Sequence, residues 1–416
     1  MSFLGELISN VFDRRYQKRL SDEVDGRATI ELCDDLLSSF GEVSGVTLAW
    51  KILERYAQMS DQEKTEFFEF LAHELGIEHD KVSETLQAYK ENPSKNTYQA
   101  FISAAEPRRQ ELAKRLNQVP GATGKLVAMR KDLLGIMGKR PDLEPLDVDF
   151  RDLFASWFNR GFLVLQPINW QTPADILDKI IAYEAVHAID SWDDLRLRLQ
   201  PSDRRCFGFF HLSIPDEPLI FVQVALTQGI PDSIQSLLSD TRTTIDAQEA
   251  DTAVFYSISN CQAGLAGISF GNSLIKQVVS DLSKDLPALT TFVTLSPIPS
   301  LNRWLGETTL EVTNLDNHKA VAAHYLTEAK NSQGMPYDPV ARFHLGNGAM
   351  IHAVHANADI SDNGRKQSNG TMVNYLYDLA QISQNHEKFV CDKTVVASHS
   401  VKALGALVTP KKAESP

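Results

Sequence analysis

Apolar positions recur at helical spacing through about the first 158 residues of the chain. In one segment Phe68, Leu71 and Leu75 fall on a single helical face. Ser60–Glu63, just before it, has the pattern of a capping box, in which each end residue bonds the backbone of the other. No convincing strand pattern interrupts these stripes. We therefore predict an all-helical bundle over residues 1–158.

Beyond that point short β-branched and aromatic runs alternate with helical stripes, which predicts a mixed α/β domain over residues 159–416 and an α+β class for the whole chain. The predicted helices are Ala174–Ala188, capped by Thr172, Leu274–Leu286 and Lys319–Ala329. The predicted strands are Phe162–Leu165, Cys206–Leu212, Leu219–Leu226, Ala253–Ser259 and Thr291–Leu295.

Composition places this pattern in an ordinary globular protein, with 43% hydrophobic and 23% charged residues. The net charge of −13 argues against nucleic-acid binding, which needs a basic face. No uncharged run is apolar enough for a membrane span, and Glu6 interrupts any signal peptide. Four cysteines without a CxxC pair fit a reducing compartment. We expect a cytoplasmic protein with no membrane or nucleic-acid partner.

Charge is unevenly distributed along the chain. The stretch Thr252–Asn302 holds only four charged residues, where the average for the chain would give about 12. Such a stretch is typical of a segment that is kept away from water.

A glycine-rich turn lies inside that stretch, between a predicted strand and a predicted helix. Gly264, Gly267 and Gly271 are spaced so that backbone amides before the helix can bind a pyrophosphate. The spacing matches neither the dinucleotide-binding motif nor the Walker loop. A turn that simply needs positive φ explains the glycines equally well.

The same turn contains Gly267-Ile-Ser269-Phe-Gly271, which fits the G-x-S-x-G pattern of a hydrolase nucleophile elbow. That motif needs the strand to run directly into the serine, whereas the predicted strand ends near Ser259. A hydrolase with Ser269 as nucleophile is therefore disfavoured.

Two further segments carry candidate chemistry. Ser296 follows a predicted strand and precedes two prolines, so it is either a preorganised hydrogen-bond donor or a simple strand terminator. His344 lies in a tight segment closed by Gly348 and can act as an acid or base near neutral pH, although a structural histidine is the commoner case. His352, His355 and Asp359 have the helical spacing of a metal site, a pattern that often arises by chance.

The order of several short motifs resembles the malonyl-CoA decarboxylase family. The motifs are YSIS, QxGLxG followed by GxxLIKxVV, LSPIP followed by Trp304, FHLxNGA and NYLYDL, and they span most of residues 250–380. LSPIP and FHLxNGA together are far more specific than a glycine pattern.

This resemblance implies an acetyltransferase-like (GNAT) catalytic domain that binds coenzyme A, preceded by a helical domain that assembles a homodimer or homotetramer. It places the catalytic pair on Ser296 and His344, with Ser257 and Tyr377 as supporting groups. It also places the coenzyme A cradle on Ala266, Gly267, Ile268, Ser269, Phe270, Gly271 and Asn272. Family members carry a glutamate where this chain has Ser269, so the role of that position is open here.

The implied reaction converts malonyl-CoA to acetyl-CoA and CO₂ and needs no cofactor. Ser296 would hold the malonyl group while His344 protonates the enolate left by CO₂. Three other functions stay open: an acyl-CoA-dependent acyltransferase, a decarboxylase of malonyl groups on a carrier protein, and a non-catalytic acyl-CoA sensor.

Overall fold

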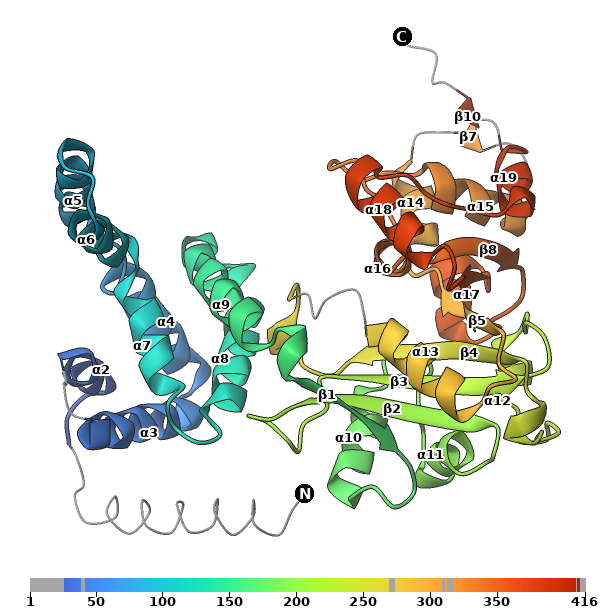
Figure 1. Cartoon of the computed structure of the whole chain (residues 1–416), viewed down its shortest axis with the longest axis horizontal. Helices are drawn as coiled ribbons and strands as arrows, with labels where there is room; N and C mark the ends of the chain where they lie inside the picture. The colour runs from blue at the N-terminus through green and yellow to red at the C-terminus, as the bar shows by residue number, and fades with distance from the viewer. Residues whose placement is uncertain are drawn as a thin grey trace. The chain divides into compact units, whose positions relative to one another are not determined.

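The computed structural model describes residues 26–38, 42–268, 274–308, 311–312, 317–408 and 410–411. These residues form two compact units (Figure 1). A helical unit holds the described residues of Met1–Phe162, His211–Pro215 and Gln262–Ser269, and a mixed unit holds the described residues of Leu163–Phe210, Asp216–Cys261 and Phe270–Pro416. A helical region followed by a mixed sheet domain confirms the predicted α+β class.

The helical unit contains no strand among its described residues up to 158, as the sequence predicts. The capping box is present, because the Ser60 side chain accepts a hydrogen bond from the backbone N of Glu63 while Glu63 bonds the backbone N of Ser60. The helices are α2 (Thr29–Ser38), α3 (Glu42–Gln58), α4 (Asp61–His73), α5 (His79–Glu91), α6 (Lys95–Ala105), α7 (Arg108–Leu116), α8 (Ala122–Met137) and α9 (Glu144–Trp157), with short 3₁₀ turns η1 (Pro141–Leu143) and η2 (Arg160–Phe162).

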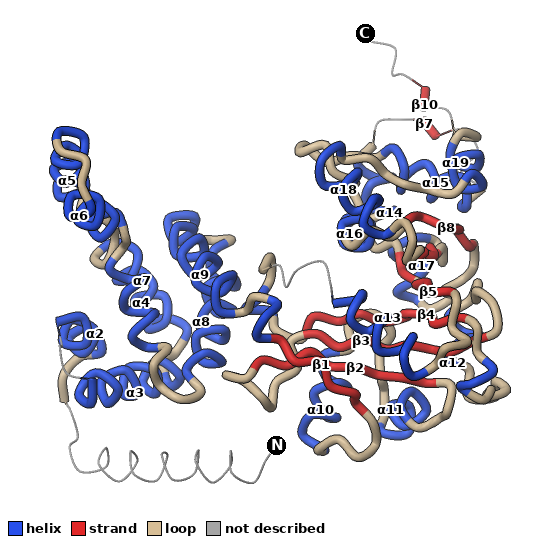
Figure 2. The backbone as a smooth tube through the Cα atoms, in the orientation of Figure 1, coloured by secondary structure: helices blue, strands red, loops and turns tan. Residues whose placement is uncertain are grey.

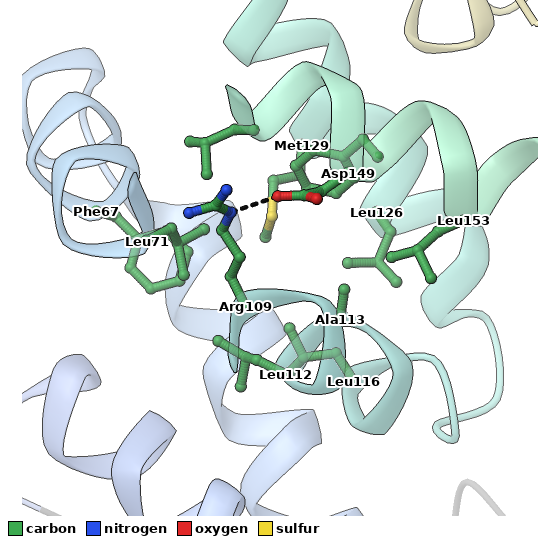
Figure 3. A pocket seen from close by; sticks show the side chains of 12 residues that line it. Phe67, Leu71, Arg109, Leu112, Ala113, Leu116, Leu126, Met129, Asp149 and Leu153 are labelled. Carbon is green, nitrogen blue, oxygen red and sulfur yellow. Dashed lines mark hydrogen bonds and ion pairs between the residues drawn. The ribbon is translucent and has the colours of Figure 1, made fainter. Parts of the chain in front are cut away.

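A largely apolar pocket lies within this unit (Figure 3). Its charged lining residues, Arg109 and Asp149, form an ion pair, and Gln110 Nε2 donates to the same carboxylate at 2.6 Å. Because these charges neutralise each other and the other lining side chains are hydrocarbon or thioether, the pocket offers neither a nucleophile nor a base. We assign it to packing.

A buried arginine joins the segment after the fourth strand to the helices of this unit. Arg130 is 1% exposed; its Nε donates to Asp147 at 2.8 Å and its Nη1 donates to the backbone O of Gly264 at 2.7 Å. A Cβ atom on Gly264 would lie 1.9 Å from the backbone O of Val127, so the close approach needs glycine. The segment is thus held by one hydrogen bond from Arg130 and by one close backbone contact with Val127.

The mixed unit is built on an eight-stranded sheet (Figure 2). The strand order is β1-β2-β3-β4-β5-β9-β6, with β8 also paired to β9. β4 and β5 run parallel, while the other registered pairs run antiparallel. The strands are β1 (Leu163–Ile168), β2 (Arg204–His211), β3 (Ile220–Thr227), β4 (Thr252–Asn260), β5 (Thr291–Thr294), β6 (Ser296–Pro297), β8 (Met350–His355) and β9 (Met372–Leu376). β7 (Glu311–Val312) and β10 (Pro410–Lys411) form a separate pair.

Helices α10 (Ala174–Tyr183) and α11 (Trp192–Leu199) pack against one face of this sheet through a buried apolar cluster that includes Ile180, Leu195 and Phe221. Each such side chain contributes about 1.5–3 kcal/mol when buried. The remaining helices are α12 (Ile234–Leu238), α13 (Leu274–Asp285), α14 (Leu301–Glu307), α15 (His318–Glu328), α16 (Pro339–Gly346), α17 (Asp362–Ser368), α18 (Ile382–Asp392) and α19 (His399–Gly405), with 3₁₀ turns η3 (Ala247–Glu249) and η4 (Ala263–Leu265). Among the residues that the structure describes, every helix falls short of the length and apolar character that crossing a membrane requires.

One predicted helix is wrong in its extent. α10 ends at Tyr183 rather than Ala188, because the carboxylate of Glu184 accepts hydrogen bonds from the backbone N of Val186 and His187 and so supports a turn instead. Its N-cap is Pro173 and not Thr172, whose hydroxyl accepts from the backbone N of Asn169. The five predicted strands are all present, with ends shifted by up to three residues.

Replacing Arg130 with methionine should lower the free energy of unfolding by about 3 kcal/mol, because the partly buried Asp147 would lose its counter-charge and the Gly264 carbonyl its donor. Lys131→Met, at the exposed neighbouring position, is the control and should change stability by less than about 0.5 kcal/mol. Urea unfolding of both variants measures the difference. Equal stabilities would contradict a structural role for the Arg130 ion pair.

Candidate active site

A cavity opens in the mixed unit where strands β4 and β5 separate. Their parallel pairing covers only four residues and ends at Phe255 and Thr294, although β4 continues to Asn260. The cavity beyond has a volume of about 240 Å³ and is called the His344 cavity below. Its lining residues are mostly apolar: Val186, Ile220, Val222, Phe255, Tyr256, Ile258, Asn260, Leu274, Ile275, Ser296, Pro297, Pro339, Val340, Phe343 and His344.

Two of the residues singled out from the sequence, Ser296 and His344, meet in the wall of this cavity. The Oγ atom of Ser296 lies 3.3 Å from Nε2 of His344 and donates a hydrogen bond to Oγ1 of Thr294 at 2.8 Å. Both residues are almost completely buried, at 6% and 3% exposed. They are 48 positions apart in the chain, so only the fold brings them together.

The position of His344 follows from the local sequence of α16. Asp338 caps this helix by accepting from the backbone N of Val340 and Ala341 at 2.9 and 3.0 Å, and Pro339 suits the first turn. Gly348 then reverses the chain with φ of +87°, where a Cβ atom would lie 2.1 Å from the backbone O of Ile382. His344 therefore occupies the last turn of a short helix that is fixed at both ends.

The other side of the His344 ring contacts two buried tyrosines on or just beyond β9. Its Nδ1 atom is 2.7 Å from the hydroxyl of Tyr377, and its ring stacks on Tyr375 with centroids 4.5 Å apart. Tyr377, which the family resemblance suggested as a supporting group, thus completes a continuous chain of hydrogen bonds with His344 and Ser296.

Burial decides the charge of the side chains in this hydrogen-bonded series. Desolvation lowers the pKa of His344 to about 3 and raises the pKa of Tyr377 well above its ordinary value of 10.0. At neutral pH His344 is therefore a neutral imidazole and Tyr377 a neutral phenol. The arrangement can donate and pass protons through hydrogen bonds without holding a fixed charge.

Ser257, the other suggested supporting residue, lies elsewhere in the mixed unit. Its hydroxyl donates to the carboxylate of Glu184 at 2.7–2.8 Å, and it does not line the His344 cavity. The register of β4 against β3 shifts here. Phe255 and Ser257 pair with consecutive residues of β3, and Tyr256 between them is an inserted residue with no paired residue on β3. This bulge breaks the alternation that would otherwise place Ser257 on the face of Phe255.

Part of the proposed coenzyme A cradle can be located. Ala266, Gly267 and Ile268 form a turn after η4 in the helical unit, and Gly267 has φ of +75°, as a glycine turn requires. Ser269, Phe270, Gly271 and Asn272 lie outside the described residues.

Two alternative motifs lose support. β4 ends at Asn260 and η4 intervenes before Gly267, so the strand does not run into Ser269 as a nucleophile elbow requires. His352 and His355 lie on strand β8, not on a helix, and His355 Nε2 bonds the side chain of Asn374. Within the described parts of the chain, no three histidine, cysteine or acidic side chains are grouped to hold a metal ion.

Sequence reasoning missed Thr294 and Tyr375, which contact Ser296 and His344, and Glu184, which contacts Ser257. Thr294 was only part of a predicted strand, Tyr375 lies within the NYLYDL motif, and Glu184 was placed inside a predicted helix. The alternation of β9 offers a partial signal, since Tyr375 and Tyr377 are two residues apart and both contact His344.

Comparison with known proteins identifies the family of the chain. Family models described as the malonyl-CoA decarboxylase N-terminal and C-terminal domains match residues 75–158 and residues 161–319 and 308–415. "Malonyl-CoA decarboxylase, mitochondrial" from Anser anser anser is 34% identical over 81% of this chain and 79% of that protein, and the Rattus norvegicus protein of the same name is 31% identical over 83% and 82%.

Two solved structures of malonyl-CoA decarboxylases are similar throughout. The protein from Agrobacterium vitis is 47% identical, with a TM-score of 0.86 over 91% of this chain and 99% of its own. The protein from Rhodopseudomonas palustris is 46% identical, with a TM-score of 0.85 over 90% and 98%. With both family models and full-length relatives matched, the chain belongs to the malonyl-CoA decarboxylase family.

Proposed function

We propose that the chain decarboxylates malonyl-CoA to acetyl-CoA in the His344 cavity. The observation that carries this proposal is the buried chain Ser296–His344–Tyr377, which reaches the wall of a mostly apolar cavity in a member of this family. A decarboxylase of this kind must stabilise an enolate and then deliver one proton, and these residues can do both.

The reaction begins when the bond between the α-carbon and the malonyl carboxylate breaks. Its electron pair moves toward the thioester carbonyl, which gives CO₂ and an enolate. The hydroxyl of Ser296 holds the malonyl group so that the carboxylate lies out of the plane of the carbonyl. An apolar lining solvates the carboxylate poorly and so favours neutral CO₂.

The second step forms a carbon–hydrogen bond. The proton on Nε2 of His344 passes to the enolate carbon, and the hydrogen bond from Tyr377 to Nδ1 stabilises the electron-rich ring until water restores the proton. Because the thioester carbonyl accepts the electron pair, this route needs no metal and no organic cofactor. Residues Ala266–Asn272 would bind the pyrophosphate of coenzyme A through backbone amides, as in GNAT domains.

Two further proposals concern the setting of the enzyme. We place it in the cytoplasm because its four cysteines are free thiols, although the curated relatives are named mitochondrial. Fractionation of the source cells tests this location.

We also propose a homodimer or homotetramer assembled through the helical unit. Its hairpin of α5 and α6 exposes Tyr98 and Ile102, at 51% and 46%, and α5 has no buried residue.

Ser296→Ala and His344→Gln should each reduce turnover of malonyl-CoA by about 10²–10⁴-fold, because one positions the substrate and the other supplies the proton. The measurement is release of acetyl-CoA and CO₂ by the pure protein without an acceptor. Exposed Ser332→Ala and His399→Gln are matched controls and should retain full activity.

Near-parental turnover in both site variants would refute the assignment of Ser296 and His344 as catalytic residues. Tight binding of malonyl-CoA by the parent without turnover would instead indicate a sensor, and a strict need for an acceptor amine would indicate an acyltransferase. Activity only on malonyl groups attached to a carrier protein would indicate that the substrate is the malonylated carrier protein and not malonyl-CoA.

Acid should destabilise the fold partly through His344. Its pKa is about 3 in the folded protein and about 6.5 when exposed, so the unfolded chain binds one more proton between these values. This contribution to stability is complete above pH 6.5 and is lost as pH falls, by up to about 1.4 kcal/mol per pH unit.

His344→Gln should therefore show a shallower loss of unfolding free energy between pH 6.5 and 5 than the parent, as measured by urea unfolding. His187, whose pKa burial lowers to about 4, contributes equally to both proteins. Identical slopes would mean that His344 is not buried neutral.

Sedimentation of the full chain should give a dimer or a tetramer. Ile102→Glu should shift the protein toward monomer, since a charge would enter the proposed contact, while Gln99→Glu at a neighbouring exposed position adds the same charge as a control. A monomeric parent at micromolar concentration would refute assembly, and equal behaviour of the two variants would refute this surface.

A further inference from the structure

The hydroxyl of Thr294 ends the hydrogen-bonded chain that begins at Tyr377. Thr294 is the last residue of β5 and is fully buried. Its Oγ1 accepts from the backbone N of Tyr375 at 3.1 Å and from Oγ of Ser296 at 2.8 Å. Its backbone O accepts from Nδ2 of Asn374 at 2.8 Å. β9 thus holds both the side chain and the backbone of Thr294.

These contacts set the direction of the protons. A backbone amide can only donate, so Tyr375 occupies one lone pair of Thr294 Oγ1. In the resting protein, with no substrate bound, Ser296 gives its single hydroxyl proton to the same oxygen. Only lone pairs of Ser296 Oγ then remain for Nε2 of His344, and a hydrogen bond between these two atoms requires the proton to be on Nε2.

The other ring nitrogen agrees with this direction. A neutral imidazole carries one proton, so Nδ1 is an acceptor when Nε2 is protonated. The hydroxyl of Tyr377, 2.7 Å from Nδ1, can donate to it. Tyr377, His344 and Ser296 each donate to the next member of the chain, and Thr294 is the acceptor at its end.

We propose that Thr294 is a positioning residue that sets the tautomer of His344 and keeps its transferable proton on Nε2. With the opposite tautomer, Nε2 would present a lone pair on the side of Ser296, and the proton would lie against Tyr377. If Thr294 cannot accept, the Ser296 proton is free to turn toward Nε2, which favours that unproductive tautomer.

The catalytic consequence rests on the proposed function, because the proton on Nε2 is the one that passes to the enolate carbon. The tautomer itself is a property of the resting protein. Its test therefore needs neither substrate nor turnover, and the two proposals can fail separately.

Nitrogen-15 NMR of the histidine-labelled full chain tests the tautomer directly. The signals of His344 are those missing from His344→Gln. In the parent at pH 7 we expect a protonated, pyrrole-type Nε2 and an unprotonated, pyridine-type Nδ1, and in Thr294→Val we expect the pattern to reverse or become mixed. A pyridine-type Nε2 in the parent overturns the proposal even if the variant does not fold. An unchanged pattern in a folded Thr294→Val also overturns it.

Steady-state kinetics test the consequence. Thr294→Val keeps the branched shape and should lower kcat at least tenfold while KM changes less than threefold. Thr294→Ser restores an accepting hydroxyl and should recover most of kcat, and Thr291→Val on the same strand is the control. Equal losses in the valine and serine variants would indicate packing rather than proton direction and would overturn the proposal. A parent without decarboxylase activity would refute the proposed function and leave the NMR result standing.

Discussion

The separation of β4 from β5 is the constraint on which the rest of the site depends. Four parallel residue pairs hold the strands together, and the pairing ends at Phe255 and Thr294. Beyond this point the sheet can no longer satisfy its own polar groups by the regular ladder. The hydroxyl of Thr294 supplies an acceptor for the backbone N of Tyr375, and its backbone O accepts from the side chain of Asn374. These two contacts tie the end of β5 to β9 at the point where its pairing with β4 stops.

Desolvation explains both the charge-poor stretch and the behaviour of the site. Thr252–Asn302 contributes β4, α13, β5 and β6, and residues from three of these elements line the His344 cavity. Charged side chains in this stretch would face a low-dielectric wall and cost several kcal/mol each unless paired. The same burial keeps His344 and Tyr377 neutral. One physical effect therefore shapes the composition of the segment and the proton chemistry beside it.

The sequence predicted the fold class and the strands of the mixed unit because hydrophobic periodicity reports local burial. It located Ser296 through the prolines that follow it, but nothing local pairs Ser296 with His344; that pairing came from resemblance to a family. Ser257, which the resemblance suggested as a supporting group, does not line the His344 cavity, and the one-residue bulge at Tyr256 that turns its side chain to the other face has no signal in the sequence. The early end of α10 depends likewise on a single side chain, Glu184, that bonds two backbone N–H groups.

The lining of the cavity also bears on how such a site can accelerate decarboxylation. No lysine, arginine or acidic residue is among the described residues that line it. A fixed cation beside the malonyl carboxylate would stabilise the ground state, whose charge is localised there, more than the transition state, in which charge moves toward the thioester oxygen. In the proposed mechanism a neutral donor such as His344 gains strength as charge develops near it, and it costs little reorganisation because its ring is held between Ser296 and Tyr377. A neutral, buried hydrogen-bond chain is therefore better suited to this reaction than a charged one.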